Sequence, residues 1–82
     1  NDLGLPLAIR ELAASVATRA SLELAVQVPE RLGNLTLAVE QCIYRVAQEA
    51  IANVAQHAEA RHMSVQLEQI DGWLRLTVTD DG

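Results

Sequence analysis

The opening of the chain, LGLPLAIRELAASVATRA, carries apolar residues at the spacing of a helix. Pro6 suits the first helical turn, where a backbone N–H has no intrahelical acceptor to lose. We therefore predict a helix over residues 6 to 19. Its apolar face contains Leu7, Ile9, Leu12, Val16 and neighbouring alanines.

The next segment, SLELAVQV, alternates between apolar and polar positions, which is the period of a half-buried strand. Pro29 ends this strand, and PERLGN reads as a loop because it contains both proline and glycine. A long helical pattern follows over LTLAVEQCIYRVAQEAIANVAQHA. Cys42 falls inside that pattern, and as the single cysteine it is expected in the core rather than in a disulfide.

Two further alternating segments, MSVQLEQ and WLRLTVTD, flank Asp71-Gly72, a pair that favours the positive backbone angles of a two-residue hairpin turn. Such a hairpin places residues of both strands on a common apolar face. The face is predicted to contain Met63, Val65 and Leu67 from the first strand and Leu74, Leu76 and Val78 from the second.

The predicted order of elements is helix, strand, helix, strand, strand. We expect an α+β fold, a two-layer sandwich in which the helices cover one face of a small, largely antiparallel sheet. The last strand reaches Asp80-Asp81-Gly82, and no further strand in this sequence can pair with its outer edge. The sequence therefore predicts a truncated fold whose edge strand can pair with a second copy of the chain.

Composition narrows the class of protein. With 82 residues, half of them apolar, the chain is one small domain or part of one. A formal charge of -5, with scattered arginines and no lysine, argues against a nucleic-acid partner. No apolar run approaches the roughly 20 residues of a membrane-spanning helix, and no signal peptide opens the chain, so we expect a soluble segment.

Within the long helix, Arg45, Glu49, Asn53 and His57 recur every four residues and form one polar stripe. The simplest interpretation is a solvated helix face on which Arg45 and Glu49 pair. A zinc site is poorly supported, because the two histidines fall on different elements and Cys42 lies on another sector of the helix. Asn53 is the unusual member, since asparagine is a poor helix former in an alanine-rich stretch.

The helix phrase YRVAQEAIANVAQHA (44–58) and the strand end at Asp80-Asp81-Gly82 closely resemble the N box and the start of the G1 box of the GHKL (Bergerat) ATP-binding fold. The glutamate, asparagine and histidine at intervals of four, together with the opening LGLPLAIREL, resemble sensor histidine kinases of the nitrate/nitrite-sensor group. The resemblance covers nearly the whole chain. It implies that residues 1–82 are the N-terminal part of a histidine kinase ATP-binding domain.

The resemblance implies a role for three residues of the stripe. Asn53 matches the magnesium ligand of the family, and its amide oxygen is a hard, uncharged donor that Mg²⁺ accepts. Glu49 matches the glutamate that activates water in the ATPase branches, which makes it the candidate catalytic residue, although a kinase should avoid activating water. His57 either stabilises the helix end or approaches a nucleotide phosphate.

Asp80 is expected to recognise the base of ATP. A carboxylate at a buried strand end accepts a hydrogen bond from the exocyclic amine of adenine, whereas guanine presents a carbonyl there. The alternative is an aspartate that closes a strand before a turn. Gly82 lets the backbone pass close to the base or sugar, and Asp81 is expected to face solvent.

The implied parent protein is a two-component sensor histidine kinase. Its ATP-binding domain passes the γ-phosphoryl group of ATP to a histidine in its own dimerisation domain, from which a response regulator takes it. The domain is expected in the cytoplasmic portion of a membrane-associated sensor, and the 82 residues alone are expected to be inactive. Two alternatives stay open: a GHKL-type ATPase clamp, which needs Glu49 as a working base, and a non-catalytic interaction module on the same fold.

Overall fold

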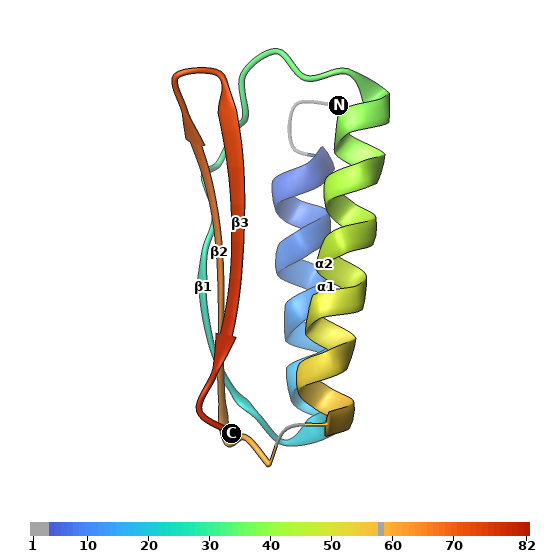
Figure 1. Cartoon of the computed structure of the whole chain (residues 1–82), viewed down its shortest axis with the longest axis vertical. Helices are drawn as coiled ribbons and strands as arrows, with labels where there is room; N and C mark the ends of the chain where they lie inside the picture. The colour runs from blue at the N-terminus through green and yellow to red at the C-terminus, as the bar shows by residue number, and fades with distance from the viewer. Residues whose placement is uncertain (1–3, 58) are drawn as a thin grey trace.

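The computed structural model of the chain describes residues 4–57 and 59–82. Its elements are α1 (Gly4–Ala20), β1 (Glu23–Gln27), α2 (Leu37–His57), β2 (His62–Ile70) and β3 (Trp73–Asp80). Both helices lie on one side of the sheet (Figure 1). The predicted order of elements and the two-layer α+β arrangement are confirmed. Leu3 and Ala58, which belong to the predicted motifs, lie outside the described residues.

The ends of the helices follow from local chemistry. At the start of α2, the hydroxyl of Thr36 accepts the N–H of Val39 at 3.2 Å, as an N-cap residue does. At the end of α1, Ser21 takes a left-handed backbone angle (φ 57°), and the N–H of Leu22 bonds to the carbonyl of Ala17 at 2.8 Å. This turn leads the chain from α1 directly into β1.

The sheet has the strand order β1-β2-β3, with β1 parallel and β3 antiparallel to β2. The expectation of a largely antiparallel sheet was therefore wrong, because one of its two strand pairs is parallel. The cause is the connection through α2, which returns the chain to the end of the sheet at which β1 began. The chain thus enters β2 in the same direction as β1.

The β2–β3 hairpin agrees with its prediction. Asp71 (φ 46°) and Gly72 (φ 83°) both take the positive angles expected of a two-residue turn. The resulting register pairs Val65 with Val78 and places the predicted apolar residues of both strands on the side that faces the helices.

The core lies between β2 and the two helices. It consists of Leu5, Ile9, Ala13, Ala17, Ala47, Ile51, Val54, Met63, Val65 and Leu67. Cys42 is exposed rather than buried, because it lies about 140° around α2 from the buried Ala47. Leu7 is also more exposed than its apolar pattern predicted.

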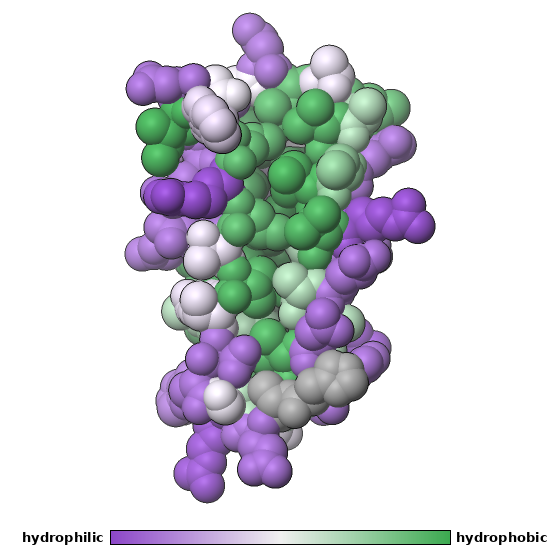
Figure 2. All heavy atoms as spheres, in the orientation of Figure 1, coloured by the Kyte–Doolittle hydropathy of each residue, from purple (hydrophilic) through white to green (hydrophobic). Residues whose placement is uncertain are grey.

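Apolar side chains remain visible along the flank where α2 packs against β3 (Figure 2). Leu74, Leu76 and Val78 of β3 are only partly buried. The sandwich therefore exposes part of its apolar interior on this side. Neither of the helices described combines the length and hydropathy needed to cross a bilayer.

Candidate functional site

The two predicted motifs meet at one end of the molecule. α2 packs against β3, and both elements run toward the same end, where the chain also finishes (Figure 1). The last turns of α2 carry Asn53 and His57, and the last residue of β3 is Asp80. The fold therefore brings the C-terminal half of the polar stripe and the Asp-Asp-Gly segment to the same end of one helix–strand pair.

The polar stripe on α2 faces solvent. Arg45, Glu49 and Asn53 are exposed, while the side chain of His57 lies outside the described residues. None of the ion pairs among the described residues joins Arg45 to Glu49, so the pairing expected from the simplest interpretation is not formed. The exposure leaves Asn53 and Glu49 accessible to a ligand.

Asp80 is exposed, which corrects the expectation of a buried strand end. The reason is its place as the last residue of an edge strand. The register sets Asp80 opposite Met63, on the side of the sheet that faces the helices. Its Oδ1 accepts the N–H of Gly82 at 2.9 Å, so the turn-closing interaction considered from the sequence is present. That turn uses Oδ1 of the carboxylate.

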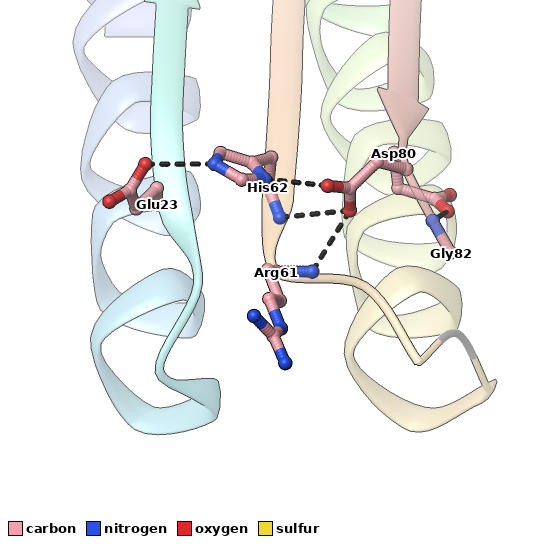
Figure 3. Close-up of polar contacts among 6 residues, drawn as sticks. Glu23, Arg61, His62, Asp80 and Gly82 are labelled. Atoms are coloured by element: carbon pink, nitrogen blue, oxygen red, sulfur yellow. Dashed lines mark hydrogen bonds and ion pairs between the residues drawn. The ribbon is translucent and has the colours of Figure 1, made fainter.

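Asp81 was expected to face solvent, but its half-exposed carboxylate binds the start of β2. Its Oδ1 accepts the backbone N–H groups of Arg61 at 2.9 Å and His62 at 3.0 Å, and its Oδ2 lies 2.5 Å from His62 Nδ1 (Figure 3). On the other side of the ring, His62 Nε2 lies 2.9 Å from Oε2 of Glu23 on β1. We refer to Glu23, His62 and Asp81 as the His62 cluster.

The sequence contained a signal for half of this cluster. An Asp71-Gly72 turn fixes the hairpin register, and counting outward from it pairs Met63 with Asp80. One further step brings His62 beside Asp81. The contact with Glu23 could not be counted in this way, because it depends on the parallel pairing of β1.

The pKa values of His62 and Asp81 shift in the directions that favour an ion pair. The hydrogen bond with Asp81 raises the pKa of His62 above its ordinary value, and the charges of Asp81 and Glu23 add to this effect. The hydrogen bond with His62 lowers the pKa of Asp81 to about 2. Asp81 shifts strongly because it also accepts the backbone N–H groups of His62 and Arg61.

A shallow cavity of about 370 Å³ lies at this end of the sheet. Its walls include His62, Met63, Asp80 and Asp81. This mixture of apolar and polar groups is typical of small-molecule sites. Among the described residues, no three His, Cys, Asp or Glu side chains gather as a metal-binding group. A metal ion held by Asn53 would therefore take its other ligands from a nucleotide and from water.

No family model matches the chain. The chain is 37% identical over its whole length to the sensor histidine kinase MctS of Rhizobium johnstonii, and it covers 18% of that protein. Over 99% of its length it is 33% identical to the sensor histidine kinase NarS of Mycobacterium tuberculosis, again covering 18%. Its homologues are sensor histidine kinases. The kinase YxjM of Bacillus subtilis is 41% identical over 44 residues, which are 54% of the chain and 11% of YxjM.

The similarity to sensor histidine kinases confirms that part of the resemblance seen in the sequence. The match to MctS includes every residue of the chain, and therefore both the polar stripe and the segment from Asp80 to Gly82. The chain spans less than a fifth of the length of each of these three kinases.

Proposed function

We propose that the chain is part of the catalytic ATP-binding domain of a sensor histidine kinase, with the GHKL fold and of the nitrate/nitrite-sensor group. In the whole protein this domain donates the γ-phosphoryl group of ATP to a histidine of a separate dimerisation domain, and a response regulator then receives it. The domain belongs to the cytoplasmic portion of a membrane-associated sensor. The observation that carries the proposal is the common position of the C-terminal half of the α2 stripe and the end of β3, in a chain whose homologues are sensor histidine kinases.

Asn53 is the proposed ligand of Mg²⁺. Its amide is exposed on α2, and a single protein oxygen suits an ion that fills its remaining positions with phosphate oxygens and water. The bound ion neutralises charge on the nucleotide phosphates. Glu49, one turn earlier on the same face, is the proposed catalytic residue and polarises the nucleophile as an acid–base group. His57, at the end of α2, contacts a phosphate when it is charged.

Asp80 is the proposed acceptor for the exocyclic amine of adenine. Its position opposite Met63, where the apolar row of β3 ends, supports this role because an adenine ring needs an apolar wall beside one polar group. Gly82 folds back onto Oδ1 of Asp80, and its lack of a side chain lets the backbone approach the base or sugar.

The test is a calorimetric titration of ADP, with and without Mg²⁺, into the full-length protein. We expect binding of ADP in preference to GDP, and we expect Asn53→Ala to remove the magnesium dependence. Asn34→Ala is the matched control, because Asn34 is an exposed asparagine in the loop that leads from β1 to α2. If folded wild-type protein binds no ADP, or if both variants behave alike, the proposal is wrong.

The edge strand supports a second, smaller proposal. β3 forms one edge of the sheet of described residues, so its outer backbone groups can pair with β3 of a second copy. Sedimentation velocity of the 82-residue chain over a range of concentrations should then show a monomer–dimer equilibrium. A monomer at every concentration would rule out this pairing.

A further inference from the structure

The His62 cluster lies on the face of the sheet that the helices leave uncovered, and the proposed function does not use it (Figure 3). It connects three parts of the chain: Glu23 belongs to β1, His62 begins β2, and Asp81 follows β3. All three side chains are substantially exposed, so the cluster adds nothing to the core. We therefore look for its effect in the chain segments that it connects.

The cluster holds the chain segment that contains the proposed base site. The β2–β3 ladder ends at the pair of Met63 and Asp80. Beyond this pair, the carboxylate of Asp81 continues the attachment to β2 by accepting the N–H groups of Arg61 and His62. Because successive residues of a strand point to opposite faces, anchoring Asp81 on the open face directs Asp80 to the helix side.

The geometry of the cluster requires a charged imidazole. Both ring nitrogens of His62 face carboxylate oxygens, at 2.5 Å and 2.9 Å, and a neutral ring has only one N–H to donate. Glu23 from β1 and Asp81 after β3 are the titratable groups that face the ring among the described residues. Arg61 is adjacent in sequence, but its guanidinium points away from the ring (Figure 3).

We propose that His62 is a positioning residue for the base site, whose imidazolium holds Asp81 against β2 and thereby sets the direction of Asp80. This inference rests on the proposed function. Its consequence is that affinity for an adenine nucleotide depends on the protonation of a residue that does not touch the nucleotide.

The sign of this dependence follows from the pKa shifts. The pKa of His62 is raised in the folded protein, so its contribution is fully present below the ordinary value of 6.5 and is lost as pH rises through the raised pKa. Asp81, with its pKa lowered to about 2, stays ionised throughout that range. Affinity is therefore expected to fall on the alkaline side.

The experiment measures the affinity of the full-length protein for ADP with Mg²⁺ by calorimetry, from about pH 6 upward to about pH 9, a range that begins below the ordinary pKa of histidine and extends above it. The decisive quantity is the ratio of the affinities of wild type and His62→Gln. We expect a ratio of up to about five at low pH, the upper end of the range for an exposed ion pair, and of about one at high pH. His57 is unchanged in both proteins, so its contribution cancels in the ratio.

Glu68→Gln is the matched control. Glu68 binds Arg75 at 2.7 Å on the same face of the sheet, nearer the hairpin turn, so its loss removes a comparable ion pair without touching the site. Its affinity profile should follow that of wild type. If Glu68→Gln reproduces the effect of His62→Gln, the effect comes from general weakening of the sheet and the inference is wrong.

Hydrogen exchange in the nucleotide-free protein gives a second readout. The amides of Arg61 and His62 bond to Asp81, so Asp81→Asn and His62→Gln should both speed exchange in the peptide that contains them. A ratio near one at every pH overturns the inference and leaves the proposed function standing. Failure of wild type to bind ADP overturns both. If His62→Gln does not fold, Asp81→Asn, which preserves the imidazole, replaces it in the affinity series.

Discussion

Met63 lies directly opposite Asp80 in the ladder between β2 and β3, so a buried methionine and an exposed carboxylate share the helix-facing side of the sheet. The apolar row of β3 runs through Leu76 and Val78 and ends in that carboxylate. The core and the candidate site are therefore consecutive stretches of one strand face. Changes in one can be separated experimentally from changes in the other.

Asp80→Asn should weaken ADP binding and remove the preference for ADP over GDP. The amide can present an N–H as well as an oxygen, so it no longer rejects the carbonyl of guanine. Calorimetry should show a loss of about tenfold in ADP affinity, because the amine of adenine then bonds to a neutral instead of a charged acceptor. Asp71→Asn makes the same chemical change at the turn before β3, where asparagine accepts a φ of 46°. Equal losses in the two variants would contradict the assignment of Asp80.

Glu49→Gln should slow autophosphorylation by about a hundredfold, the usual contribution of a positioned acid–base group, with little change in ADP affinity. Transfer of labelled γ-phosphate to the protein measures autophosphorylation, and release of free phosphate, measured in parallel, reports ATP hydrolysis. Glu40→Gln, in the first turn of the same helix, is the control. Release of phosphate as the main reaction of wild type would instead favour the ATPase clamp.

Ile51→Ala should destabilise the domain by about 2–5 kcal/mol, because it opens a cavity at a fully buried position between α2 and the sheet. The loss of stability is measured by urea unfolding of the full-length protein, with hydrogen exchange of peptides from α2 as the local readout. Val46→Ala removes apolar atoms from a side chain that is 49% exposed on the same helix, and its effect should stay within about 0.5 kcal/mol. Similar effects of the two variants would mean that the buried face of α2 is assigned incorrectly.

Gly72→Ala should cost about 1–2 kcal/mol, since an L side chain at a φ of 83° is strained. Nothing lies within 4 Å of the added Cβ, so the whole cost comes from the backbone. Gly33→Ala is the comparison, because there the nearest atoms to the added Cβ belong to the flexible side chain of Gln69. A shift in urea midpoint no larger than that of Gly33→Ala would argue against the turn geometry described for Gly72.

Asp81→Asn should lower the pKa of His62 toward its ordinary value, because the hydrogen bond with Asp81 is the largest cause of the raised value. In wild type, the raised pKa predicts that unfolding temperature falls as pH rises through it, and in Asp81→Asn this fall should shrink. Thermal unfolding across the same pH range, with imidazole resonances followed by NMR, measures both effects. An unchanged His62 titration in the variant would show that Asp81 does not hold the ring.

The secondary structure was predictable because each element has a local pattern, and Asp71-Gly72 alone fixed the hairpin register. The parallel position of β1 was not predictable, since it depends on where α2 returns the chain. The exposure of Cys42 was missed because its neighbour Ile43 fits the same apolar pattern, and only the packing of α2 decides which of the two turns inward. Of the candidate site residues, the stripe and Asp80 were predicted from their motif, whereas the complete His62 cluster could not be predicted because it draws on three elements.

In the sequence, β1 and β2 are separated by the whole of α2, whereas β2 and β3 are joined by a two-residue turn. Hairpins close in microseconds, but contacts across long loops form later because the chain must first lose more conformational entropy. We therefore expect the hairpin to assemble early and β1 to dock late. Glu23 would then reach His62 among the last contacts of folding, and a nascent or partly opened domain would contain the hairpin before it contains a complete His62 cluster.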